Sequence, residues 1–95
     1  MALFTLFVEF EGGGSFSTQV LAENAAAAVR QLIEGEAIAE VLKDAPSWPF
    51  QFTEADIFLL IPMKGLTNMF LCQMGRDGKY VSITIARTVS RQAAD

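Results

Sequence analysis

The chain has 95 residues, of which 52% are hydrophobic and 19% are charged, and its formal net charge is −4. This length and apolar content suit one domain with one core and exclude a second domain. Histidine is absent, which excludes histidine-based triads, the commonest zinc sites and the usual near-neutral acid–base residue. We expect a single domain over residues 1–95, with residues from about 90 to 95 forming a flexible tail.

We also expect a soluble, cytoplasmic protein without a membrane span. The first residues lack the positive flank and the small-residue cleavage site of a signal peptide, and Glu9 interrupts their apolar stretch. The longest uncharged apolar run, residues 57–63, is far too short to cross a bilayer. Cys72 is the single cysteine, so no internal disulfide can form, which fits a reducing compartment.

The first predicted element is a hairpin that closes at Gly12-Gly13-Gly14. Even-numbered positions hold the better core candidates in both strands. Keeping both of these faces on one side requires a loop with an odd number of residues, because a shift by one would move Phe16 to the other face. We predict a three-residue loop, Gly12–Gly14. The predicted pairs are Phe10 with Phe16, Val8 with Thr18 and Leu6 with Val20.

Three adjacent glycines also invite comparison with phosphate-binding loops. Such loops lie between a strand and a helix N-terminus and carry a Lys-Ser/Thr or spaced-glycine pattern. Here a strand follows and Glu11 precedes, so an anion would meet a carboxylate. We interpret the glycines as a turn that needs positive φ.

A helix is predicted to follow the hairpin, with Asn24 as its N-cap and four alanines in its first turn. A buried stripe is expected at Ala25, Val29, Leu32 and Ile33. The apolar residues after Gly35 fall opposite this stripe if the helix continues. We predict two helical segments, about 24–34 and 36–44, with Gly35 as cap or kink. The alternative is one helix buried on two sides and clasped by another subunit.

The connector that follows holds Pro46 and Pro49, which cannot continue a helix. Its aromatic residues allow two interpretations. They line a ligand pocket, or they plug the edge of a small core, and we favour the plug. These residues are Trp48, Phe50 and Phe52.

The last forty residues are predicted to form strands over about 57–61, 66–75 and 79–89. The stretch Arg76-Asp77-Gly78-Lys79 is a strong hairpin signal, because Asp-Gly suits turns that need positive φ. A loop of two or four residues gives the same register and one apolar ladder. The predicted pairs are Met74 with Val81, Cys72 with Ile83 and Phe70 with Ile85.

The resulting order, β-β-α-β-β-β, predicts an α+β fold: an antiparallel sheet of four to five strands with one kinked or split helix on one face. The uncovered face would then expose more apolar surface than a monomer usually does. We expect a homo-oligomer, with a dimer favoured, through this face or an edge strand. The candidate interface residues are Leu3, Phe7, Leu21, Met69 and Leu71.

Charge divides unevenly along the chain. Residues 1–56 hold nine acidic and two basic side chains, net −7, whereas residues 57–95 hold two acidic and five basic ones, net +3. The basic half is a weak candidate for nucleic acid, because the chain is acidic overall and Arg76 and Lys79 cluster at a turn. We expect the basic end to complement the acidic helix instead, in the same chain or in a neighbour.

Catalytic groups are few, and we predict no catalytic, cofactor-binding or metal-binding residue. Glu9 and Glu11 share a strand face, but alternating charges on an outward face are ordinary. Cys72 falls on the predicted core face without a basic neighbour, so we expect a buried thiol.

The stretch LFTLFVEFEGGGSFSTQVLAENAAAAVRQLIE resembles the start of a set of small uncharacterised bacterial proteins. These open with a strand, a glycine turn, a strand ending in Gln-Val and an alanine-containing helix, and the resemblance implies no function. It is more distantly similar to HicB-type antitoxins. Those proteins place a proline-glycine-cysteine strand before the helix, where this chain has Ala22-Glu23. The resemblance covers about a third of the chain and transfers no functional residue.

Three functions are compatible with these observations. The one we favour is a non-catalytic protein-interaction module, antitoxin-like or immunity-like. The second is a small-ligand binder with its pocket at the aromatic connector. The third is an enzyme that uses carboxylates alone, which we regard as the weakest of the three.

Overall fold

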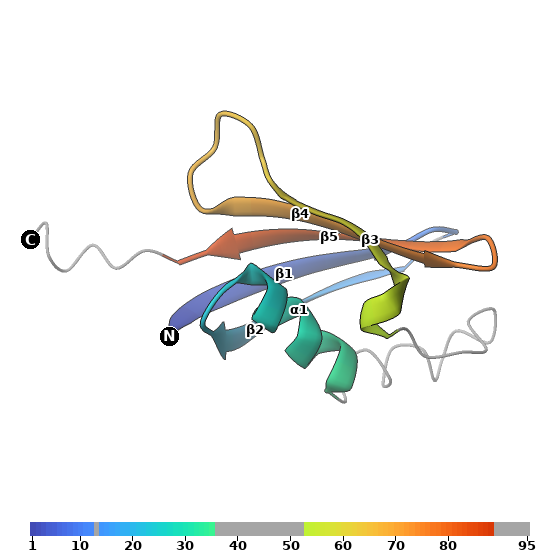
Figure 1. Ribbon diagram of the computed structural model, residues 1–95, viewed down its shortest axis with the longest axis horizontal. Coiled ribbons are helices and arrows are strands. Elements are labelled where there is room, and N and C mark those ends of the chain that lie inside the picture. The colour runs from blue at the N-terminus through green and yellow to red at the C-terminus, as the bar shows by residue number, and fades with distance from the viewer. Residues whose placement is uncertain (13, 36–52, 89–95) are drawn as a thin grey trace, which may run out of the picture.

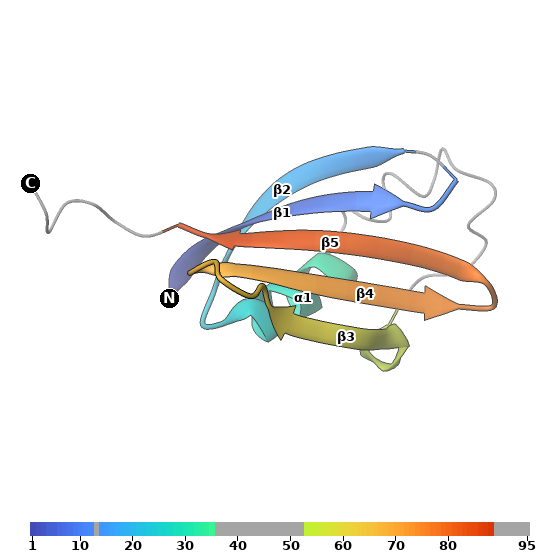
Figure 2. The ribbon, with the colours of Figure 1, turned by 90° about the horizontal axis from the view of Figure 1, so that it is seen from above.

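A computed structural model describes residues 1–12, 14–35 and 53–88. They form one five-stranded antiparallel sheet and one α-helix in the order β-β-α-β-β-β, which confirms the predicted α+β fold. The strand order in the sheet is β2-β1-β5-β4-β3 (Figure 2). The elements are β1 (Ala2–Phe10), β2 (Ser15–Ala22), α1 (Ala25–Glu34), the 3-10 helix η1 (Glu54–Asp56), β3 (Ile57–Pro62), β4 (Met69–Arg76) and β5 (Lys79–Arg87).

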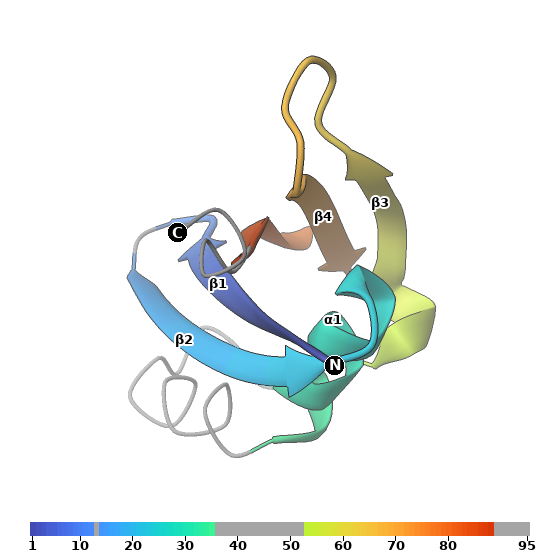
Figure 3. The same ribbon diagram turned by 90° about the vertical axis from the view of Figure 1, so that its left-hand side faces the viewer.

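The sheet is arched, and α1 lies on its concave side (Figures 1 and 3). The two hairpins are joined by the antiparallel pairing of β1 with β5, in which Leu6 lies opposite Ile85 and Val8 opposite Ile83. All core side chains of the sheet therefore point to the side that α1 covers. The buried core consists of Phe4, Leu6, Val8, Phe10, Ala22, Ala25, Ala28, Val29, Leu32, Ile33, Cys72, Met74, Val81, Ile83 and Ile85.

The register of the first hairpin differs from the prediction by two residues. Even-numbered residues do share the core face, but Val8 lies opposite Phe16 and Leu6 opposite Thr18. Phe10 N–H donates to Gly14 O at 3.0 Å, and the loop is centred on Gly12 rather than Gly13. The side-chain period of two fixes the face and an odd loop, but it cannot distinguish registers that differ by two.

Two of the loop glycines have backbone conformations that favour glycine. Gly12 and Gly14 have φ of 93° and 95°, which L side chains rarely adopt. The Phe10 ring stacks on the Phe16 ring at a centroid distance of 6.1 Å, although the two residues are not directly paired. The turn interpretation of the glycines is thus supported by their φ angles.

The second hairpin has the predicted register, with Met74 opposite Val81 and Cys72 opposite Ile83. Its loop has two residues, Asp77 and Gly78, with φ of 54° and 80°. Positive φ at both positions is what the favoured two-residue hairpin turn requires. Both strands are shorter than predicted. Strand β4 begins at Met69 rather than at residue 66, and β5 ends at Arg87 rather than at residue 89.

Helix α1 begins as predicted, since Asn24 Oδ1 accepts a hydrogen bond from Ala27 N–H at 2.8 Å. The predicted stripe is buried, together with Ala28. The helix ends at Glu34 with Gly35 as its cap, but φ of Gly35 is −80°, so positive φ is not the reason for glycine. A Cβ there would lie 2.8 Å from Gln31 O, to which Gly35 N–H donates. The predicted second segment, 36–44, lies outside the described residues, as do residues 90–95.

Two ion pairs hold η1 between the helix and the sheet. Arg76 Nη2 on β4 lies 2.6 Å from Asp56 Oδ2, and Arg30 Nε on α1 lies 2.7 Å from Glu54 Oε1. Asp56 also accepts from Thr53 N–H at 2.7 Å. The hydrogen bond from Arg76 lowers the pKa of Asp56 below its usual value. Each pair joins the acidic first half of the chain to a basic residue, and in one of them that residue comes from the second half.

We expect Asp56→Asn to lower the free energy of unfolding at pH 7 and to have a smaller effect at pH 3. A lowered folded-state pKa contributes stability above the unfolded-state pKa, about 3.9, and loses it as the pH falls through the folded-state value. Urea denaturation of both proteins at the two pH values measures this. A difference that does not change with pH would show that the ionised carboxylate contributes nothing.

Candidate functional site

The face of the sheet opposite α1 is uncovered in the described part of the chain. Figure 2 looks onto this face, with the helix behind it. Odd-numbered residues of β1, β2 and β4 and even-numbered residues of β5 point to it, because neighbouring side chains along a strand alternate. The loop between β3 and β4 rises from this side (Figures 1 and 3). We call it the outer face.

One row of side chains crosses four strands of the outer face. Phe7 lies opposite Thr84, Thr84 opposite Leu71, and Leu71 opposite Ile61. Side chains directly opposite one another are in contact distance. Phe7 and Ile61 each keep 46% of their surface exposed, so this mainly apolar row is open to solvent at both ends.

An aromatic pair lies at one end of the same face. A bulge between Ile57 and Leu59 turns Phe58 outward, where its ring meets Tyr80 edge to face at a centroid distance of 6.1 Å. The Tyr80 ring lies over Gly75, where a Cβ would come within 2.5 Å of Tyr80 Cδ1. Phe58 is 58% exposed and Tyr80 47%. A methyl group added at position 75 would therefore force the Tyr80 ring to shift.

These residues form one surface, which we call the apolar patch. Leu59, half-buried on β3, lies between Phe58 and Ile61 along the strand, and the hydrogen-bonded polar pair Gln73 and Ser82 lies beside it on the same face. The patch is concentrated on β3, β4 and β5, with Phe7 extending it onto β1. It consists of Phe7, Phe58, Leu59, Ile61, Leu71 and Tyr80.

All five predicted interface residues lie on the outer face, but the structure divides them. Phe7 and Leu71 belong to the patch. Leu3 and Leu21 lie opposite each other at another corner, and Met69 lies opposite Ala86. Their role in an interface stays a prediction.

Phe58, Ile61 and Tyr80 were not among the predicted interface residues. Ile61 alternates with Leu60, which is half-buried against the core, so alternation along β3 could have indicated it. The outward turn of Phe58 depends on the bulge, which the apolar run does not reveal. Tyr80 falls on this face by alternation along β5, and its place opposite Gly75 follows from the predicted register of the second hairpin.

One end of the outer face is acidic, with the exposed carboxylates Glu9 and Glu11. Exposed Glu9 separates two shallow hollows, one beside Ser15 and Ser17 and one beside Glu11 and Tyr80. Among the described residues, no three His, Cys, Asp or Glu side chains are grouped so that they could hold a metal ion.

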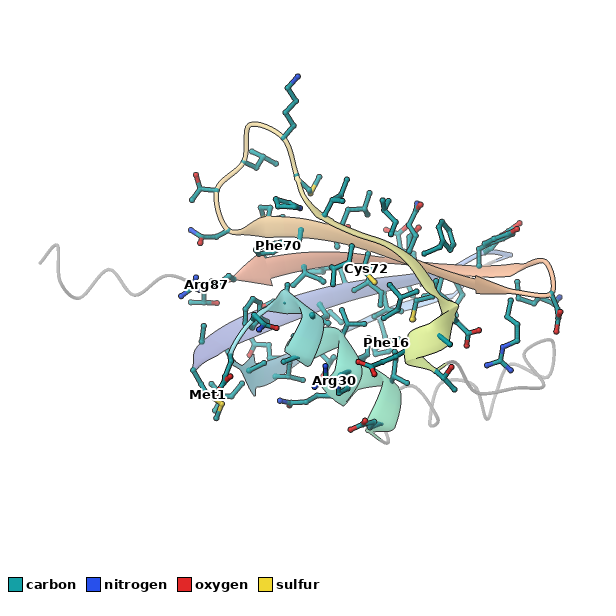
Figure 4. All side chains as sticks on the ribbon, in the orientation of Figure 1. Met1, Phe16, Arg30, Phe70, Cys72 and Arg87 are labelled. Atoms are coloured by element: carbon teal, nitrogen blue, oxygen red, sulfur yellow. The ribbon has the colours of Figure 1, made fainter. Side chains whose placement is uncertain are left out.

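Cys72 lies in the core between sheet and helix, as predicted (Figure 4). Burial raises the pKa of its thiol to about 11. The thiol is therefore protonated at neutral pH and inaccessible, which is the opposite of what a nucleophilic cysteine needs. The other predicted site, at Trp48, Phe50 and Phe52, lies outside the described residues.

No family model, curated protein or solved structure matches this chain. The resemblance of its first third to small bacterial proteins and to HicB-type antitoxins therefore stays a prediction. Among the described residues, no helix has the length and hydropathy needed to span a membrane.

We expect Cys72 to react slowly with a thiol-specific disulfide reagent at pH 8 in the folded protein, because both burial and the raised pKa suppress the thiolate. Addition of denaturing urea should raise the rate to that of a free cysteine. Fast reaction in the absence of urea would contradict the buried position.

We expect Gly75→Ala to lower the free energy of unfolding by about 1–3 kcal/mol, because the new methyl displaces the Tyr80 ring. Tyr80→Ala provides the matched background, where the same glycine substitution should cost much less. Urea denaturation of the two single variants and the double variant gives the coupling. Additive losses would show that the close approach of ring and backbone is unimportant.

Proposed function

We propose that this protein is a non-catalytic interaction module that binds a partner protein through the apolar patch. The observation that carries the proposal is the exposure of Phe7, Phe58, Ile61 and Tyr80 on a sheet face that nothing covers within the described residues. Several large apolar side chains exposed on one face in this way are typical of interaction sites.

The composition of the patch suits a binding surface. Aromatic side chains such as those of Phe58 and Tyr80 are enriched at the centres of protein interfaces, where a few residues supply most of the binding energy. Full burial of a large apolar side chain is worth about 1.5–3 kcal/mol. Covering the exposed half of four such side chains therefore gives a gross gain of a few kcal/mol before the costs of association.

Charge at the margin of the patch indicates the chemistry of the partner. At the end of β1, exposed Glu9 lies opposite Ser82, and exposed Glu11 lies beside Tyr80, to whose carbonyl oxygen its N–H donates. Complementary charges at a rim favour encounter and orient the partner. We infer that the partner has an apolar centre with basic residues beside it. In binding such a partner, this protein would act as an antitoxin-like or immunity-like module.

Catalysis by the described polar side chains has less support than binding. The one thiol is buried and protonated, and the exposed Glu9 and Glu11 face solvent rather than an enclosed cleft. We also propose that the protein is soluble and cytoplasmic, comes from a bacterium and self-associates.

We expect Phe58→Ser/Ile61→Ser to weaken capture of the partner at least tenfold, because about 1.4 kcal/mol of lost contact already gives that factor. The measurement is affinity capture from the native cell followed by titration of the captured protein. Circular dichroism and urea denaturation would establish that the variant is folded.

Leu21→Ser is the matched control, since Leu21 is 56% exposed on the same face but lies outside the patch. Its capture should equal that of the natural protein. Equal capture by all three proteins would refute the patch as the binding surface. A captured small molecule with no protein would favour the ligand-binding alternative instead.

A further inference from the structure

The two edges of the sheet differ in how they are protected against further pairing. At one edge, β3 has six residues, a bulge after Ile57 and Pro62 at its end. Short length, bulges and proline are the devices by which proteins block edge-to-edge association. At the other edge, β2 has eight residues in uninterrupted register with β1, without a charged residue or a proline.

The hydrogen-bond pattern shows which groups of β2 point outward. Thr88 N–H donates to Leu3 O, so the odd-numbered residues of β1 bond toward β5. Leu21 lies opposite Leu3, and the groups of such a pair in an antiparallel ladder point away from each other. The odd-numbered residues of β2 therefore direct both N–H and C=O to the open edge.

One of these outward groups already has a partner. Gln31 Nε2 on α1 donates to Leu21 O at 2.8 Å. No strand lies beyond β2 in the part of the chain that the structure describes. Ser15, Ser17 and Gln19 thus present three N–H and three C=O groups along an exposed edge. Unpaired edges of this kind are templates for strand addition.

We propose that β2 of a second copy pairs antiparallel with this edge and forms a ten-stranded sheet. The two-fold axis passes at Ser17, which lies opposite Ser17 of the second copy, while Ser15 lies opposite Gln19. This register uses all three open positions on each strand, giving six hydrogen bonds, and leaves Leu21 O to Gln31.

Charge and packing favour a second copy as the occupant. Because β2 is uncharged, pairing it with itself opposes no like charges. Phe16 and Thr18 are only half-buried on the core side, and the pairing places Phe16 of one copy beside Thr18 of the other. The cores of the two copies then meet across the new strand pair. The proposal supplies a surface for self-association and does not rest on the apolar patch.

Proline substitutions test the pairing. Ser17→Pro and Gln19→Pro each remove an N–H that points away from β1, so the hairpin ladder keeps its bonds. Light scattering should give twice the 10.4 kDa chain mass for the natural protein at ~100 μM and one chain mass for the variants. A monomeric natural protein, or dimeric proline variants that are folded by circular dichroism, would overturn the proposal.

A second measurement does not depend on proline being tolerated. Ser17→Cys should form an intermolecular disulfide under mild oxidation, since directly paired Cα atoms about 5.5 Å apart suit a disulfide. Gln19→Cys is the matched control, because the two introduced thiols would lie about 13 Å apart along the strand. Absence of the Ser17→Cys disulfide, or an equal yield from both variants, would overturn the register.

The proposed edge pairing and the proposed binding patch can be tested independently. Phe58→Ser/Ile61→Ser should remain dimeric while losing the partner, and the proline variants should lose the dimer while still capturing the partner. A patch variant that becomes monomeric would place self-association on the outer face and overturn the edge pairing.

Discussion

The pairing of β1 with β5 is the interaction on which the rest of this structure depends. It joins two hairpins from opposite ends of the chain, with Phe4 opposite Arg87 and Phe10 opposite Val81. Each hairpin alone would be marginal in water, since two strands cannot bury their apolar face. Joined, they place the apolar ladders of β1, β4 and β5 side by side beneath α1. The same step defines the outer face, because side chains alternate along each strand and those next to the core residues point to the opposite side.

That pairing is also the part of the fold that local sequence patterns specify least. Alternation shows that Leu6 and Ile85 both belong to a core face, but it does not show that they are neighbours. The second hairpin was predictable because Asp77-Gly78 restricts the turn to positive φ at two positions. The first was not, since three consecutive glycines allow centres at Gly12 or Gly13 with the same parity. The helix start was predictable because Asn24 acts through bonds within one turn.

The candidate site shows the same division between local and non-local information. Phe7 and Leu71 could be assigned to the outer face by alternation, yet their common neighbour Thr84 follows only from the order of the central strands. Phe58 points to the outer face because of a bulge, and an unbroken apolar run in the sequence does not predict that bulge. Gly75 becomes meaningful only once Tyr80 lies across it. Residues whose roles depend on a partner strand are those that sequence reasoning missed.

The two proposed surfaces have a geometric relation that follows from antiparallel pairing. Side chains of paired residues lie on the same side of a sheet, so joining two β2 strands puts both outer faces on one side and both helices on the other. Each patch would lie about three to four strands from the two-fold axis, which separates the two patches by about 35 Å if curvature is ignored. Two patches held at a fixed spacing bind a two-fold symmetric partner with an effective concentration that a single patch lacks. A modest patch of a few partly exposed side chains is then sufficient for tight binding, provided that the spacing of sites on the partner matches.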